Sequence, residues 1–232
     1  MRLGLLGDIH GNYLALEAVL ASAVDQGVDE LIITGDLVGY YFWPKETIEL
    51  IDSSNVTIVK GNHEGMLEDA RQNPSILPKI EQKCGCGLRI ALEELTPQQL
   101  DWLALLPCSV ETTFGGLKTE IYHGSPWDLN QYIYPSANSD ILIRFAKMDC
   151  DLVILGHTHY PMVLKCAKTT VVNPGSVGQP RNKVPGAHWA IVDTKSMEVD
   201  FLTEVYDYDQ VINSAQIRKP YIPYLWEVLT RT

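Results

Sequence analysis

The 232-residue sequence has little positive charge and no apolar run long enough to cross a membrane. It contains 18 Lys and Arg against 29 Asp and Glu, a net charge of −11. So acidic a surface repels phosphodiester backbones and anionic lipids, and a membrane helix needs about 20 consecutive apolar residues. We therefore expect no membrane association, and nucleic acid is a poor candidate partner.

The cysteines are few and unevenly spaced. There are five of them, an odd number, and the only close pair is Cys84 and Cys86. A zinc ribbon needs a second pair at a comparable interval, and a chain of this length does not need disulfides to fold. Because the N-terminal apolar run is short and ends at Asp8, it does not resemble a signal peptide. We expect plain thiols and a cytoplasmic protein.

Short apolar runs alternate with helical patterns in the first third of the chain. The runs at 3–6, 31–34 and 56–59 are typical of strands buried on both faces. Apolar residues recur at helical spacing over 16–24, and Pro44 opens a second helical segment. The order strand, helix, strand, helix, strand predicts parallel pairing.

The rest of the chain changes character. No strand pattern occurs over about 64–107, and a capping box at Thr96 indicates a helix there, so we expect a helical insert. The later patterns predict a hairpin at 110–123, a helix at 136–147, a buried strand at 152–155, and antiparallel strands at 162–165, 170–172, 188–192 and 198–203. Without repeats, low-complexity tracts or long linkers, residues 1–232 are expected to form a single α/β domain.

Residues able to bind metal follow the predicted strands at their carboxyl ends. They are Asp8, His10, Asp36, Asn62, His63, His123, His157 and His159. A lone Asp or Asn at such a position more often makes a turn or a helix cap, but five of the six histidines belong to this set. Because ligands bind where the carboxyl ends of parallel strands converge, we expect one shared site. The sixth histidine, His188, is interpreted as a packed residue.

Spacing and residue type within these clusters suit metal coordination. Side chains two positions apart on an extended segment point the same way, so Asp8 with His10, and His157 with His159, can each face one cavity. Carboxylate, carboxamide and imidazole donors suit first-row divalent ions, and the lack of cysteine argues against a structural thiolate zinc site. Seven donors, leaving His63 aside, exceed what one ion takes from a protein. We therefore expect two ions that share a ligand.

Taken in order, these motifs resemble the metal-binding blocks of the calcineurin-like metallophosphoesterases. The blocks are Asp8-x-His10, Gly35-Asp36, Gly61-Asn62-His63-Glu64, His123 and Gly156-His157-x-His159. Residues 173–181, Asn-Pro-Gly-Ser-Val-Gly-Gln-Pro-Arg, resemble the small bacterial phosphodiesterase branch. The resemblance implies a four-layer αββα sandwich of two facing mixed β-sheets.

The same resemblance implies a role for each site residue. One ion is assigned to Asp8, His10 and His159, the other to Asn62, His123 and His157, and Asp36 is the bridging ligand. The ions would be Mn, Fe, Zn, Ni or Co, with manganese favoured, and a bridging hydroxide would attack phosphorus. His63 would lie outside the ligands as the catalytic residue, facing the leaving group.

Two positions depart from the family pattern. In many relatives an Asp three residues after the bridging Asp orients the catalytic His, and here that position is Gly39. What orients His63 is therefore open. Glu64 stands where an Asp is usual, a milder change because both are acids at a predicted helix start.

The sequence predicts that the substrate is a small phosphodiester or phosphomonoester, and a nucleotide derivative is one candidate. Little else in the sequence identifies it. The aromatic run 40–43 could stack on a base, but adjacent residues rarely face one ligand, so loop packing is favoured. Arg181 fits a phosphate contact or a surface position equally well. Trp127 is interpreted as a loop anchor.

Other functions share these motifs. A protein phosphatase or a dinucleoside polyphosphatase would use the same site, and some relatives with this fold act as scaffolds for partner proteins. Scaffolds typically lose a metal ligand or the catalytic His, whereas this chain keeps all of them. We therefore expect a metal-dependent phosphoesterase, and the sequence indicates no oligomeric state.

Overall fold

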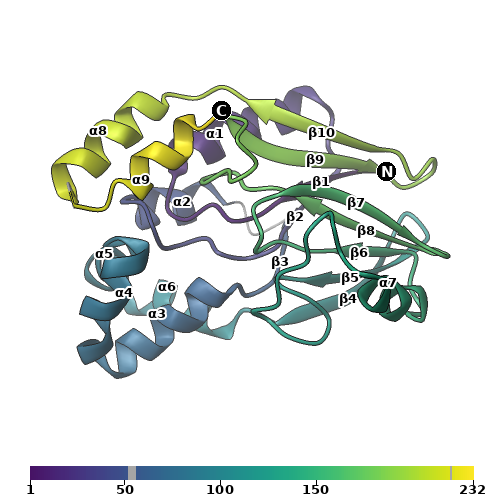
Figure 1. Cartoon of the computed structure of the whole chain (residues 1–232), viewed down its shortest axis with the longest axis horizontal. Helices are drawn as coiled ribbons and strands as arrows, with labels where there is room; N and C mark the ends of the chain where they lie inside the picture. The colour runs from purple at the N-terminus through teal and green to yellow at the C-terminus, as the bar shows by residue number, and fades with distance from the viewer. Residues whose placement is uncertain (52–55, 220) are drawn as a thin grey trace.

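The computed structural model describes residues 1–51, 56–219 and 221–232, and these form two five-stranded sheets flanked by helices (Figure 1). The first sheet has the strand order β10 (Val199–Glu204), β9 (Ala187–Asp193), β1 (Arg2–Leu6), β2 (Glu30–Ile33), β3 (Val56–Ile58). The second has the order β4 (Ser109–Phe114), β5 (Leu117–Tyr122), β6 (Leu152–Ile154), β8 (Thr169–Pro174), β7 (Pro161–Cys166).

The helices connect the strands or follow them. They are α1 (Tyr13–Asp25), α2 (Pro44–Leu50), α3 (Asn62–Gln72), α4 (Leu77–Cys84), α5 (Gly87–Glu94), α6 (Pro97–Leu105), α7 (Ser139–Ala146), α8 (Tyr208–Arg218) and α9 (Tyr224–Glu227), with 3₁₀ turns η1 (Pro74–Ile76) and η2 (Val228–Thr230). Helices α3 to α6 occupy the region where a helical insert is expected. In Figure 1 they form the lower left of the molecule, beside α8 and α9.

The two-residue period of the strands builds the layers. On β1, Leu3 and Leu5 pack in the cluster between the sheets, with Ile121 of β5 and Ile154 of β6, whereas Leu6 packs against the helices. A third cluster joins the other face of the second sheet to α7. The order is helix, sheet, sheet, helix, which confirms the expected four-layer sandwich.

Pairing follows the predicted pattern at the N-terminus and departs from it later. β1 pairs parallel with β2, and β2 with β3, as expected. The late antiparallel strands do not form a sheet of their own. The β9–β10 hairpin extends the first sheet through β1, and the β7–β8 hairpin joins the second through a parallel pairing of β8 with β6. Both sheets are therefore mixed.

Local capping sets the helix boundaries. The Asn12 side chain accepts a hydrogen bond from the Ala15 amide at the start of α1, and the capping box predicted at Thr96 begins α6. The helix predicted from residue 136 starts instead at Ser139, because Asn138 caps it. No helix in the described ranges has the length and apolarity that a membrane span requires.

Candidate metal centre

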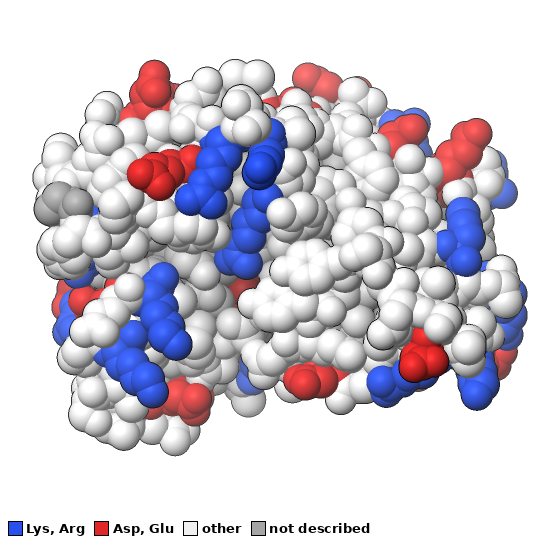
Figure 2. Space-filling view, in the orientation of Figure 1, with Lys and Arg blue, Asp and Glu red and all other residues white. Residues whose placement is uncertain are grey.

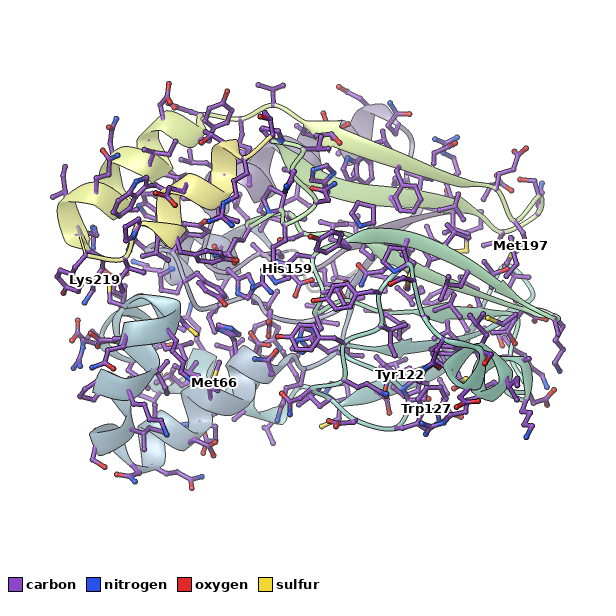
Figure 3. The ribbon with its side chains drawn as sticks, viewed as in Figure 1. Met66, Tyr122, Trp127, His159, Met197 and Lys219 are labelled. Atoms are coloured by element: carbon purple, nitrogen blue, oxygen red, sulfur yellow. The ribbon has the colours of Figure 1, made fainter. Side chains whose placement is uncertain are left out.

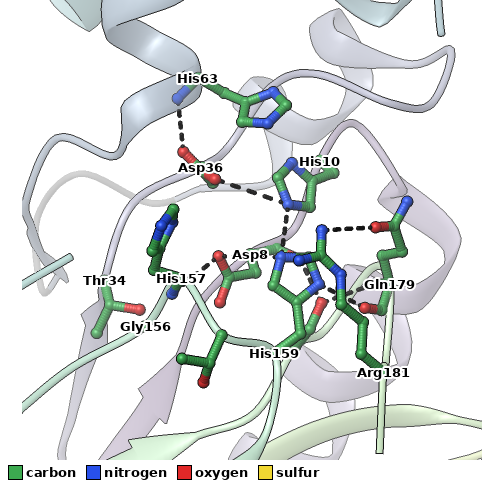
Figure 4. Close-up of polar contacts among 12 residues, drawn as sticks. Asp8, His10, Thr34, Asp36, His63, Gly156, His157, His159, Gln179 and Arg181 are labelled. Carbon is green, nitrogen blue, oxygen red and sulfur yellow. Dashed lines mark hydrogen bonds and ion pairs between the residues drawn. The ribbon is translucent and has the colours of Figure 1, made fainter. Parts of the chain in front are cut away.

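The loops that follow β1, β2, β3, β5 and β6 meet where the two sheets adjoin, and they bring the seven candidate ligands together. Figure 4 shows Asp8, His10, Asp36, His157 and His159 among them. Figure 3 shows one of them, His159, near the middle of the molecule. Six of the seven are buried, none of these more than 6% exposed, and Asn62 is half-buried. These six are Asp8, His10, Asp36, His123, His157 and His159.

The donor atoms form two groups joined by one carboxylate. In the first, His10 Nε2 lies 3.2 Å from His159 Nε2, which is 3.5 Å from Asp8 Oδ1. In the second, His123 Nε2 lies 2.9 Å from Asn62 Oδ1 and 3.1 Å from His157 Nδ1.

A single atom, Asp36 Oδ2, lies between the two groups. It is 3.7 Å from His10 Nε2 in the first group and 3.4 Å from His123 Nε2 in the second. Among the described residues, Asp36 is thus the carboxylate placed to reach both sets of donors.

The other ring nitrogen of each of these histidines faces a backbone carbonyl. The contacts are His10 Nδ1 to Val38 O (3.3 Å), His123 Nδ1 to Thr34 O (2.7 Å), His157 Nε2 to Asn130 O (3.2 Å) and His159 Nδ1 to Gln179 O (2.5 Å). Because a carbonyl only accepts, the outer nitrogen carries the hydrogen and the inner nitrogen presents a lone pair to the cluster. Burial lowers the pKa of His123 to about 4 and that of His157 to about 3, so these rings are neutral.

The carboxylates of Asp8 and Asp36 are buried, as the histidine rings are. Asp8 Oδ2 is buried and has no hydrogen-bond partner in the part of the chain that the structure describes. Burial raises the pKa of Asp36 to about 7, against the hydrogen bond from the His63 amide. Converging lone pairs and an unpaired buried carboxylate oxygen repel one another unless a cation lies among them, so these residues fit divalent metal ions.

The backbone at the site is strained. Five of the candidate ligands have positive φ angles, which cost about 1–2 kcal/mol each for residues other than glycine. They are Asp8 (53°), His10 (56°), Asp36 (55°), His157 (68°) and His159 (62°). Strain that clusters in this way is typical of residues held for function.

Comparison with known proteins agrees with this geometry. The family model of the calcineurin-like phosphoesterase superfamily domain matches residues 1–197. The chain belongs to this superfamily. An uncharacterized protein of Methanocaldococcus jannaschii is 28% identical over 234 residues, which cover 91% of this chain and 92% of the relative.

Two solved structures share the fold over the whole chain. A metallophosphoesterase from Sphaerobacter thermophilus has a TM-score of 0.79 and 27% identity, covering 100% of this chain and 98% of that one. A hypothetical protein from Pyrococcus horikoshii OT3 has a TM-score of 0.88 and 22% identity, and the match covers 99% of this chain and 98% of that one.

His63 lies beside the candidate metal centre, with Gly39 at the position where the family resemblance implies an orienting Asp. Its ring packs between His10, with ring centroids 4.6 Å apart, and Tyr40, at 5.0 Å. Its amide donates to Asp36 Oδ1 at 2.8 Å. Its Nδ1 faces Gly39 and, among the described residues, has no hydrogen-bond partner. Packing, rather than an orienting carboxylate, therefore positions this ring.

Glu64 accepts hydrogen bonds from four backbone amides, a role beyond the favourable charge at a helix start that the sequence predicts. Its Oε2 accepts hydrogen bonds from the amides of Gly61 (2.8 Å) and Asp36 (2.9 Å), and its Oε1 from those of Leu37 (2.8 Å) and Val38 (3.3 Å). Burial and the Asp36 charge raise the pKa of Glu64 to about 7, and the amides oppose that shift. One side chain thus holds the loop that carries Asp36 onto the start of α3.

Segment 173–181, which resembles the phosphodiesterase branch, supports the site from outside. Ser176 Oγ donates to the Asp8 carbonyl at 2.7 Å, and Asn173 Nδ2 to the Gly156 carbonyl at 2.6 Å. The Gln179 carbonyl is the oxygen that orients His159. The segment thereby fixes the β1 and β6 loops relative to each other.

Two of the candidate substrate-binding residues, Arg181 and Tyr40, lie at the site. Arg181 extends toward His10 and His159 (Figure 4), and its guanidinium donates to Tyr40 Oη at 3.2 Å and to Gln179 Oε1 at 3.1 Å. Tyr40, Tyr41 and Phe42 are all buried in the same core cluster, and Tyr40 also borders the site, where its ring packs against those of His10 and His63. The sequence did not distinguish these orientations.

Proposed function

We propose that this chain hydrolyses small phosphodiesters or phosphomonoesters at a pair of divalent metal ions. Asp8, His10 and His159 would hold one ion, Asn62, His123 and His157 the other, and Asp36 would contact both. The observation that carries this proposal is the position of Asp36 Oδ2, 3.7 Å and 3.4 Å from histidines of the two groups. A site for one ion would not need a carboxylate between two complete sets of donors.

Bound divalent ions supply Lewis-acid activation of water and of phosphoryl oxygens, and the protein's contribution is to position the reacting groups. The carbonyls that accept from the outer histidine nitrogens hold the rings in the tautomer that offers a lone pair. Arg181, anchored by Tyr40 and Gln179, keeps its charge near His10 and His159, where a phosphate oxygen can accept from it.

His63 is proposed as the group that assists departure of the alcohol. Because Nδ1 faces Gly39, we assign to Nε2 the proton that would move from the His63 imidazolium to the leaving oxygen, which leaves a neutral ring. Burial lowers the pKa of His63 to about 3 and opposes the imidazolium, so the negative charge of the ester has to offset it. Proton donation by a positioned side chain is worth about 10²–10⁴ in rate. We assign His63 to neither ion, although one of its ring nitrogens lies within 4.8 Å of donor atoms of His10 and Asp36, so its removal is expected to slow the reaction and leave the metals in place.

The test is hydrolysis of p-nitrophenyl phosphate and bis(p-nitrophenyl) phosphate by the protein before and after chelation, with Mn²⁺ restored as the first ion tried. We expect turnover that requires metal, and a loss of at least 100-fold in His63→Ala with metal content unchanged. No turnover of either ester by metal-loaded protein would contradict the proposal and favour a scaffold. Loss of metal from His63→Ala would make His63 a ligand.

A further inference from the structure

The loop between β5 and α7 presents two exposed tyrosines beside the candidate metal centre. Tyr132 is 49% exposed and Tyr134 is 41% exposed, although Ile133 between them is buried in the core under α7. The alternation of one inward and two outward residues is that of an extended segment. The two tyrosines, called the tyrosine shelf below, are thus held facing outward by the anchored residue between them.

The shelf is in direct contact with the site. The Tyr132 ring lies with its centroid 4.1 Å from that of His157, at an interplanar angle of 35°. The Tyr134 ring is almost parallel to the Tyr132 ring, with a centroid distance of 5.9 Å and an interplanar angle of 9°. The Tyr160 ring packs edge-on against Tyr134, with a centroid distance of 5.5 Å. The aromatic surface therefore begins at a candidate ligand and extends outward from it.

The loop that carries the shelf is rigidly held. Ser125 Oγ accepts from the amides of Trp127 (3.1 Å) and Asp128 (3.0 Å) and donates to Gln131 Oε1 at 2.7 Å. The Asn130 carbonyl, two residues before Tyr132, accepts from His157 Nε2. Preorganised aromatic rings lose little conformational freedom when a ligand stacks on them.

Positive charge lies within reach of the shelf. Arg181 extends toward His10 and His159 (Figure 4), in the same candidate site as His157, whose ring contacts Tyr132. The Arg181 charge also lowers the pKa of Tyr134, against burial and Tyr132, which raise it. On the face shown in Figure 2, Lys and Arg side chains gather above and to the left of an uncharged central surface, despite the net charge of −11. An anionic ligand with an aromatic group matches both features.

We propose that the tyrosine shelf binds the aromatic ring of a phosphodiester, and that this ring belongs to the alcohol that stays on phosphorus. This inference rests on the proposed function. His63, the proposed donor to the leaving group, packs on His10 in one donor group, whereas Tyr132 packs on His157 in the other. A ring on the shelf is accordingly on the side away from the departing alcohol.

The experiment varies the retained alcohol and keeps p-nitrophenolate as the leaving group. The probes are the methyl, phenyl and thymidine 5′ esters of p-nitrophenyl phosphate, assayed with Mn²⁺-loaded protein. We expect kcat/KM for the phenyl and thymidine esters to exceed that for the methyl ester by about tenfold, chiefly through KM, as expected for stacking on an aromatic side chain. A higher value for thymidine than for phenyl identifies a nucleoside, and equal values identify any aryl group.

Variants then test the shelf itself. Tyr132→Ala should reduce the aromatic-to-methyl ratio about tenfold, and Tyr132→Phe should keep it, because stacking needs the ring and not the hydroxyl. The ratio cancels any loss of metal that follows from disturbing His157. Phe201→Ala, which removes a ring 43% exposed on β10, is the matched control and should leave the ratio unchanged.

Two results would overturn the inference, and they are distinguishable. If all three esters are hydrolysed equally well, or if Tyr132→Ala lowers all three by the same factor, the shelf binds no ring and the proposed function stands. If none is hydrolysed by metal-loaded protein, the proposed function fails and the inference fails with it.

Discussion

A side chain on residue 39 would occupy the position of the His63 ring. A Cβ built on Gly39 lies 2.1 Å from His63 Nδ1, closer than any two such atoms approach. Gly39 also has a φ of 104°, a conformation that residues with a side chain rarely adopt. Where many relatives place an Asp that orients the catalytic His, this chain leaves space for the His ring itself.

Gly39→Ala is therefore expected to displace His63 without removing a candidate metal ligand. A shift of about 1 Å in a reacting group costs about 100-fold in rate, so we expect kcat for bis(p-nitrophenyl) phosphate to fall by about that factor at unchanged metal content. Steady-state kinetics with metal analysis of the same samples measures both quantities.

Gly116→Ala is the matched control. Gly116 has a similar φ of 92°, but a Cβ built there meets no atom within 4 Å. This variant should lose about 1 kcal/mol of stability from backbone strain and keep full activity. Equal losses of activity in the two variants would show that strain, and not the contact with His63, matters at residue 39.

Glu64→Gln should destabilise the fold around Asp36. The amide nitrogen that the substitution introduces cannot accept a hydrogen bond, so up to two of the four amides that now donate to the carboxylate lose their partner. An unpaired buried amide costs about 1–3 kcal/mol, which corresponds to a fall in Tm of roughly 5 °C.

The control for Glu64→Gln lies on the same helix. Glu68, partly exposed and 3.7 Å from Arg71, makes a surface ion pair worth less than about 1 kcal/mol. Differential scanning calorimetry of Glu64→Gln and Glu68→Gln compares the two sites. A Tm for Glu64→Gln within a degree of that for Glu68→Gln would contradict the role assigned to Glu64.

His188 should make stability depend on pH. It is 4% exposed, its Nε2 donates to the Val184 carbonyl at 2.8 Å, and its Nδ1 accepts from the Thr203 hydroxyl at 3.1 Å. Burial lowers its pKa in the folded state, so the unfolded chain takes up the proton first. The stability contributed by neutral His188 is complete above about pH 6.5 and is lost as the pH falls below it.

Urea unfolding between pH 5 and 8 measures this effect in wild type and His188→Gln. The free energy of unfolding of the wild type should fall more steeply toward pH 5, by at most about 1.4 kcal/mol per pH unit for one proton. Groups at the metal centre titrate in both proteins and cancel in the comparison. Parallel profiles would show that His188 is not held neutral.

The convergence of the site could be predicted from sequence for a local reason. Buried strands are short apolar runs, and the polar residues that follow them, such as Asp8 and Asp36, stand out against these runs. Parallel strands carry their carboxyl ends to one edge, which predicts that the clusters after β1, β2 and β3 meet. The clusters after β5 and β6 belong to the second sheet, and that this sheet faces the first was implied by the family resemblance alone. The spacing of Asp8 with His10 predicts an extended segment with both side chains on one side, but both residues have positive φ angles, so a turn and not strand geometry brings them to one cavity.

What the sequence left open depends on long-range packing. Nothing local indicates that β6 joins the second sheet or that β9 extends the first, because both choices bury the same apolar residues. Similarly, the run 40–43 does not reveal that Tyr40 borders the site, since this depends on the packing of its ring against His10 and His63, which lie far from it in the sequence. The tyrosine shelf was missed, although the alternation of Tyr132, Ile133 and Tyr134 was visible.

The central claim is that seven side chains hold two divalent ions, and anomalous diffraction from Mn²⁺-loaded crystals tests it most directly. The account predicts two anomalous peaks per chain, one among Asp8, His10 and His159, the other among Asn62, His123 and His157, with Asp36 contacting both. A single peak at full Mn²⁺ saturation, or peaks away from these residues, would contradict it.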